Sequence, residues 1–279
     1  MYYNEVRKDS SNLPGFAGNI SAIDWKAGTD KLRGYNFYYD KMARLVKADY
    51  REGELANSHF GTAYTYDRMG NLLTLKRNGL VKNETYGEVD ILTMEYDGNR
   101  LKKVENTGEE TGNKETMYFA DGIHSDTEYQ YDVNGNMTAD LNKGISIEYN
   151  SMNLPQRICF TKAKNTESRY IYAADGTKLA YIGTDKRTDY VGNIIYEDGK
   201  LKRILTEGGY IEDGKYYFYL TDHLGNDRVV ADEEGNIVQT THYYPFGMPF
   251  AESSSPDKQP YKYNGKEPVS YTHLRAHET

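Results

Sequence analysis

The chain has 279 residues, including 28 Tyr and 26 Gly, and its 34 basic and 42 acidic residues give a net charge of −8. This aromatic content excludes an intrinsically disordered chain, and the lack of clustered Lys and Arg speaks against a nucleic-acid partner. The single cysteine excludes an internal disulfide framework, and no apolar run reaches the ~20 residues of a membrane span.

The first expected element covers residues 35–50. Tyr39 and Asp40 end a predicted strand, and Leu45 lies in the strand that returns beside it. The apolar spacing within residues 41–50 also fits an amphipathic helix. Copies of the same pattern further along the chain favour two strands.

The pattern is an aromatic pair, an Asp, a turn with Gly or Asn, and a return to apolar residues. In its fullest copy, Tyr129 and Tyr131 are two residues apart and therefore share one face of a strand. Asp132 can accept hydrogen bonds from backbone N–H groups of the turn, and Gly135 supplies the positive φ of a tight reversal. Met137 then resumes the apolar face, so this unit is predicted to be a β-hairpin.

Further copies lie at residues 64–72, 96–101, 149–154 and 170–181, and another hairpin is expected over residues 228–243. The repeat residues with this expected structural role are Tyr39, Asp40, Tyr66, Asp67, Gly70, Asn71, Tyr96, Asp97, Tyr131, Asp132, Gly135 and Asn136. Successive anchoring tyrosines are 27, 30, 35, 18 and 23 residues apart, which indicates hairpins of variable length and not a fixed-pitch solenoid.

The fold predicted from these units is all-β. A lone hairpin is at best marginally stable in water, so the consecutive β-hairpins are expected to pair laterally into one long curled sheet. Closure of such a sheet would remove its exposed edges.

These units, followed by an ordered series of motifs in residues 216–267, resemble the RHS/YD-repeat family and its RHS repeat-associated core. The residues that carry the core resemblance are Tyr219, Asp222, His223, Leu224, Gly225, Asn226, Arg228, Asp232, Gly235, Tyr244, Pro245, Phe246, Gly247, Tyr263, Asn264, Gly265, Lys266 and Glu267. The resemblance implies a β-cocoon shell, and it covers most of the chain.

The resemblance also suggests a division of the chain. Residues 1–190 form the YD-repeat sheet region, residues 191–267 an incomplete core, and residues 268–279 an expected non-native tail that matches nothing in the family. The first seven residues lack the apolar region of a signal peptide. The repeats favour an internal piece of a longer exported chain over a cytosolic protein.

The function that the resemblance implies is a non-catalytic shell segment of a secreted or surface-exposed bacterial protein. Its partners would be the rest of the RHS shell and an encapsulated C-terminal toxin that this chain lacks. The alternative is a carbohydrate- or protein-binding surface module, because exposed Tyr and Asn side chains can stack on and hydrogen-bond surface glycans.

Two polar groups in the sequence are candidate sites of chemistry. Asp222 and His223 are adjacent, so on a strand they would point to opposite faces and would not converge as a catalytic pair. The loop that begins at Asp132 resembles a calcium loop, but Lys143 stands where a bidentate Glu is required. No catalytic residue, metal or cofactor is expected.

Overall fold

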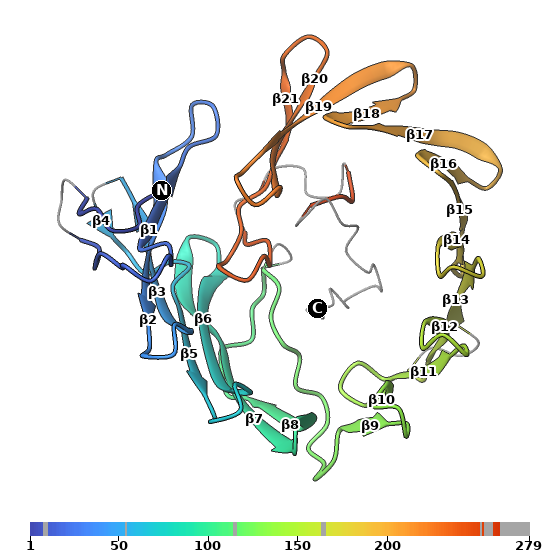
Figure 1. Cartoon of the computed structure of the whole chain (residues 1–279), viewed down its shortest axis with the longest axis horizontal. Helices are drawn as coiled ribbons and strands as arrows, with labels where there is room; N and C mark the ends of the chain where they lie inside the picture. Colours follow the sequence, from blue (N-terminus) through green and yellow to red (C-terminus); the bar gives the residue numbers. More distant parts are fainter. Residues whose placement is uncertain are drawn as a thin grey trace.

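The computed structural model describes residues 1–7, 11–53, 55–113, 116–162, 166–251, 253 and 259–262. Within these ranges the chain forms two antiparallel sheets (Figure 1). Sheet A contains β1 (Ala22–Trp25), β2 (Arg33–Tyr39), β3 (Leu45–Glu52), β4 (Leu55–Ala56), β5 (Thr62–Tyr66), β6 (Leu72–Lys82), β7 (Thr85–Asp97) and β8 (Arg100–Asn106).

Sheet B contains the remaining strands in chain order: β9 (Tyr129–Tyr131), β10 (Met137–Asp140), β11 (Ile145–Tyr149), β12 (Pro155–Phe160), β13 (Thr166–Tyr172), β14 (Lys178–Ile182), β15 (Arg187–Val191), β16 (Ile194–Glu197), β17 (Lys200–Thr206), β18 (Gly209–Glu212), β19 (Lys215–Thr221), β20 (Asp227–Asp232) and β21 (Ile237–Thr240). Within each sheet the strands pair antiparallel in chain order, except that β3 pairs with β5 as well as with the short β4. This order confirms the predicted all-β fold of consecutive hairpins. The helical alternative for residues 41–50 is wrong, because β3 occupies residues 45–50.

The hairpin turns follow the chemistry expected from the repeat. Asp132 Oδ1 accepts hydrogen bonds from the backbone N–H of Asn134 at 2.9 Å and of Asn136 at 2.8 Å, while its Oδ2 accepts one from the Asn136 amide. Gly135 has a φ of 88°. The same bonds to Oδ1 recur around Asp67 and Asp232. The acidic residue and the glycine therefore reverse the backbone together.

The two sheets replace the single sheet that the sequence suggested. After β8, residues 107–113 and 116–128 cross the inner side of sheet A before β9 begins, and we call them the crossing segment (Figure 1). Phe119 N–H, in this segment, donates to Asp90 Oδ1 at 2.8 Å. Among the described residues, no ladder of paired strands joins β8 to β9, the facing strands of the two sheets.

Sheet B continues without a break across residues 190–191, where the sequence motifs placed a boundary. The division into 1–190 and 191–267 therefore remains a proposal about motifs. Residues 268–279, the expected tail, lie outside the described residues.

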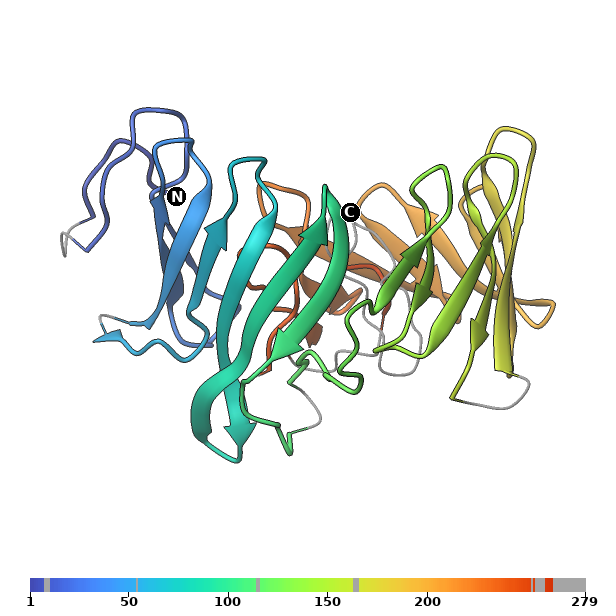
Figure 2. The same cartoon turned by 90° about the horizontal axis from the view of Figure 1, so that it is seen from below.

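The strands of both sheets lie around a ring (Figures 1 and 2). They follow one another in a single layer, which we call the wall. Residues 241–251, which we call the strap, lie inside the ring beside sheet A (Figure 1). The main core forms where the strap meets sheet A, and its buried members include Tyr35, Tyr50, Phe60, Tyr244 and Phe250. The wall therefore has an inner side that carries the core and an outer side.

One turn tests the role of the positive φ. Ala43 occupies the position that corresponds to Gly135 and has a φ of 60°. Since an L side chain pays about 1–2 kcal/mol in this region, Ala43→Gly should raise the free energy of unfolding by about 1 kcal/mol. Gly135→Ala should lower it by a similar amount, as measured by chemical denaturation.

Gly112→Ala is the matched control for this pair. Gly112 lacks a positive φ, and a Cβ there would meet nothing within 4 Å. Equal effects of Gly112→Ala and Gly135→Ala would contradict the account of the turn.

Candidate functional site: the links that hold the ring

The anchoring tyrosines of the repeats connect one hairpin to the next. Each hydroxyl donates to a backbone carbonyl that precedes its own hairpin in the sequence. The six links are Tyr39 to Ile20, Tyr66 to Leu45, Tyr96 to Leu72, Tyr131 to Leu101, Tyr149 to Met137 and Tyr172 to Pro155, with oxygen–oxygen distances of 2.7 to 3.0 Å. These half-buried tyrosines thus pair their hydroxyls with main-chain groups.

One of these links spans the gap between the sheets. Tyr131 in β9 donates to Leu101 in β8 at 2.9 Å, although these strands share no ladder. The tyrosine link therefore continues where the β-sheet hydrogen bonds stop.

A buried glutamate also stabilises the junction between β8 and β9, which we call the seam. Glu128 is fully buried, its backbone N–H donates to the carbonyl of Lys102, and its Oε2 accepts bonds from the Val104 N–H and the Asn142 amide. Two of these bonds, with the Lys102 carbonyl and the Val104 N–H, join Glu128 to β8.

The strap joins the end of sheet B to the start of sheet A. The Trp25 indole N–H donates to His242 Nδ1 at 3.2 Å, and His242 Nε2 lies 3.3 Å from Asp30 Oδ2. Phe250 stacks on Phe60 with ring centroids 3.9 Å apart. These contacts connect residues more than 180 positions apart and span the gap between β21 and β1.

A buried ion pair lies beneath both inner segments. Arg77 in β6 is paired with Asp90 in β7 and also donates to Met248 of the strap and to the carbonyl of Met117 in the crossing segment. Its guanidinium lies 5.3 Å from the ring centre of Tyr244. One cation therefore positions the strap and the crossing segment on the same sheet.

The first motif of the core series forms a turn. Asp222 accepts hydrogen bonds from Leu224, Asn226 and Arg228, and the guanidinium of Arg228 lies 5.1 Å from the Trp25 ring centre. Burial pushes the pKa of Asp222 up, but the bonds from Asn226 and the charge of Arg228 outweigh it and leave the pKa below its usual value. His223 is exposed beside this turn.

The remaining core residues have structural surroundings as well. Gly225 and Gly235 have positive φ, and Asp232 accepts the turn bonds of its own hairpin. In the strap, the hydroxyl of Tyr244 donates to the Asn78 carbonyl at 2.6 Å.

The segment that follows Tyr244 is a turn. Pro245 and Phe246 lie in it, the Phe246 ring packs against Tyr64, and Gly247 has a φ of 87°. The last motif residues, Tyr263, Asn264, Gly265, Lys266 and Glu267, lie outside the described residues.

Sequence reasoning missed Asp227, the most perturbed carboxyl of this region. It is 2% exposed, and Gln259 Nε2 lies 3.3 Å from its Oδ2. Burial raises the pKa of Asp227 to about 7, and the charge of Asp222 acts in the same direction against the Gln259 bond. Nothing local in the sequence distinguishes this residue from an exposed turn aspartate.

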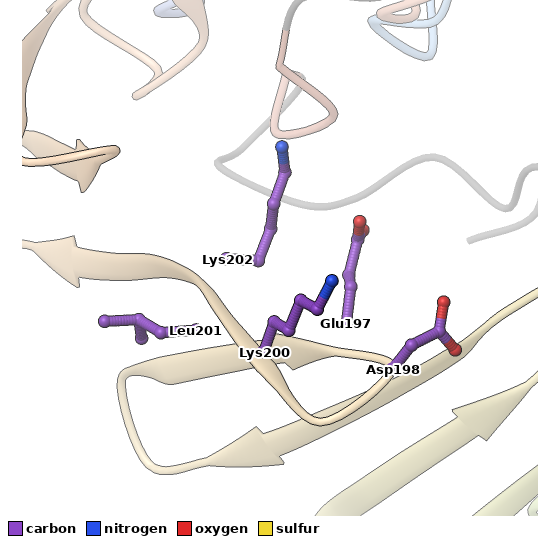
Figure 3. Close-up of a pocket in the computed structure, with 5 residues that line it drawn as sticks. All are labelled: Glu197, Asp198, Lys200, Leu201 and Lys202. Carbon is purple, nitrogen blue, oxygen red and sulfur yellow. The ribbon is translucent and has the colours of Figure 1, made fainter.

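A crevice of about 420 Å³ lies where the two sheets meet, and Tyr96, Leu101 and Tyr131 are among the residues that line it. A crevice of about 310 Å³ at the β16–β17 turn is lined by that hairpin alone, and Figure 3 shows Glu197 and Lys202 pointing to one side of it and Leu201 to another. Within the described ranges, no group of three or more His, Cys, Asp or Glu could hold a metal ion. In the same residues no helix is long and apolar enough to cross a membrane.

A single-layered wall of hairpins, linked by tyrosines and spanned by an internal strap, defines a structural shell protein. A family model described as Teneurin YD-shell matches residues 5–267, and the chain belongs to this family. The recognition made from the repeat residues is thereby confirmed. No curated protein matches the chain.

Solved structures share the fold. The chain is 17% identical to the crystal structure of TcdB2-TccC3-TEV, with a TM-score of 0.55 over 90% of this chain and 15% of that chain. The Photorhabdus luminescens Tc holotoxin pore is 15% identical, with a TM-score of 0.51 over 85% of this chain and 15% of that one. The chain thus spans about one seventh of the length of these proteins.

Removal of one hydroxyl tests the seam. Tyr131→Phe should lower the free energy of unfolding by about 1 kcal/mol, because the Leu101 carbonyl loses its hydrogen bond. Tyr216→Phe is the control, since this ring is 51% exposed. Equal losses in chemical denaturation would contradict a role of the tyrosine link in stability.

Titration of Asp227 tests whether this carboxyl is buried at its contact with Gln259. Because its pKa is raised in the folded state, the neutral form stabilises the fold. This contribution is complete below about pH 4, the unfolded pKa, and is lost as the pH rises towards 7. Between pH 5 and 7 the free energy of unfolding should fall by roughly 1 kcal/mol per pH unit more than in Asp227→Asn.

Asp185→Asn serves as the control for this titration, since Asp185 is exposed. A slope that is unchanged in Asp227→Asn would show that Asp227 titrates normally.

Proposed function

We propose that this chain is a non-enzymatic wall segment of a secreted or surface-exposed shell, which encloses and helps to deliver a polypeptide such as a C-terminal toxin. The observation that carries the proposal is the wall itself: hairpins joined by tyrosine links, with an inner side able to face enclosed material. Its partners would be the other shell components and the enclosed chain.

The middle of sheet B supports this role. Ile158 in β12 is buried, and Ile147, Phe160 and Tyr170 pack around it on one face. On the opposite face, Arg157 is ion-paired with Glu148 and Glu167 at 3.1 and 2.7 Å. An apolar inner side and a charged outer side fit a partition between an enclosed chain and water.

The polar groups near Asp222 support a structural role over a hydrolytic one. Both oxygens of Asp222 are engaged by the turn and by Arg228, and His223 is not among their partners. A catalytic carboxylate would instead orient the histidine. His223→Ala is accordingly expected to leave shell assembly intact.

Protease protection tests enclosure. In the polypeptide that carries this segment together with its downstream region, the downstream region should resist limited proteolysis while the shell is native. Trp25→Ala, which removes the indole that meets His242, should speed its digestion at least tenfold. Val133→Lys, at a 96% exposed turn position, should not. Rapid digestion in the native wild-type protein would contradict the proposal.

A further inference from the structure

Two carboxylates of the crossing segment bind the free edge of β8. Asp121 Oδ2 accepts the backbone N–H of Asn106 at 3.0 Å, and Glu128 Oε2 accepts that of Val104 at 3.0 Å. Val104 and Asn106 are two positions apart on one strand, so their N–H groups point to the same edge. The two carboxylates therefore lie next to each other along this edge, where β8 has no partner strand.

Each of these carboxylates has a second oxygen that is buried and accepts no hydrogen bond, namely Asp121 Oδ1 and Glu128 Oε1. Glu128 is 0% exposed and the side chain of Asp121 is 8% exposed. Among the described residues, the one basic group within 4 Å of either carboxylate is His124, whose exposed ring has Nδ1 3.6 Å from Asp121 Oδ1. Burial of carboxylates without a compensating positive charge is unfavourable.

The spacing of the two carboxylates suits a single bound cation. Backbone N–H groups two residues apart on a strand are separated by about 7 Å. Each carboxylate is held through one oxygen, which leaves the other oxygen of each for a shared ligand. A calcium ion binds oxygens at about 2.3–2.6 Å and so joins two that are up to about 5 Å apart.

We propose that Asp121 and Glu128 bind a calcium ion at the seam. Only two acidic side chains meet here, so backbone carbonyls of the irregular crossing segment and water molecules complete the six to eight oxygens that calcium takes. Magnesium fits less well, because it requires a near-ideal octahedron. With two carboxylates, the dissociation constant is expected to be on the order of 0.1–1 mM, the range of extracellular calcium modules.

Asn142 orients this site without being a ligand. Its amide Nδ2 donates to Glu128 Oε2 at 2.7 Å, and its Oδ1 accepts the backbone N–H of Ile123 at 3.1 Å. Both polar atoms of the amide are thus engaged, and they hold Glu128 and the crossing segment together. A calcium ion bound here stabilises the seam, since it fixes the crossing segment on β8.

Calcium titration of the whole chain after treatment with EGTA tests the proposal. Calcium at about 10 mM should raise the melting temperature by at least about 3 °C, and excess EGTA should reverse the shift. The same concentration of magnesium should have a smaller effect. Terbium(III), which replaces calcium and luminesces when nearby tyrosine rings are excited, should bind with a signal that calcium displaces.

Charge-removing variants locate the ion. Glu128→Gln and Asp121→Asn should each weaken calcium binding at least tenfold, whereas Asp185→Asn, at an exposed carboxyl, should leave it unchanged. Circular dichroism checks the fold, and Asp121→Asn serves alone if Glu128→Gln fails to fold. No calcium-dependent shift would overturn the proposal. So would binding that neither variant weakens, or an equal shift with magnesium, since these would arise from ions elsewhere on the surface. Neither enclosed polypeptide nor protease enters this test, so its outcome is independent of the proposed shell function.

Discussion

The hydrogen bond from a tyrosine hydroxyl to the carbonyl of a preceding strand is the interaction on which the wall depends. It satisfies a polar tip that burial would otherwise penalise, and it fixes the position of each hairpin relative to the one before. A ring with a hydroxyl reaches further than a ladder bond. The link from Tyr131 to Leu101 therefore persists where the sheet itself is interrupted.

Two sets of contacts, which we call devices, join parts of the wall that the hairpin repeat does not pair. At the seam, the buried carboxylate of Glu128 binds the N–H of Val104 and so replaces part of a ladder. Between the ends of the wall, the strap carries His242 and Phe250 to Trp25 and Phe60. In both devices a buried polar atom has a hydrogen-bond partner, Glu128 Oε2 at the first and His242 Nδ1 at the second, which makes the arrangement specific as well as stable.

The local chemistry of the fold could be predicted from the sequence. Alternation of rings, followed by Asp and Gly, predicts hairpins such as that of Tyr131, Asp132 and Gly135, because period and turn geometry are properties of neighbouring residues. The crossing segment has no such period, so the interruption after β8 could not be foreseen. The pairing of Trp25 with His242 is equally invisible, since 217 positions separate the two residues.

The candidate site shows the same division. The turn around Asp222 follows from its spacing to Asn226, whereas the burial of Asp227 depends on Gln259, which lies 32 positions away. Sequence motifs thus identify the repeat. Tertiary contacts determine which hairpins lie at the seam and which turn residues are buried.

The tyrosine links, Glu128 and the strap together make one cooperative unit of two sheets that share no ladder. Differential scanning calorimetry of the wild-type chain measures this cooperativity. We expect a single transition in which the calorimetric and van't Hoff enthalpies agree. Two separate transitions, or a calorimetric enthalpy well above the van't Hoff value, would show that the sheets unfold independently and would contradict it.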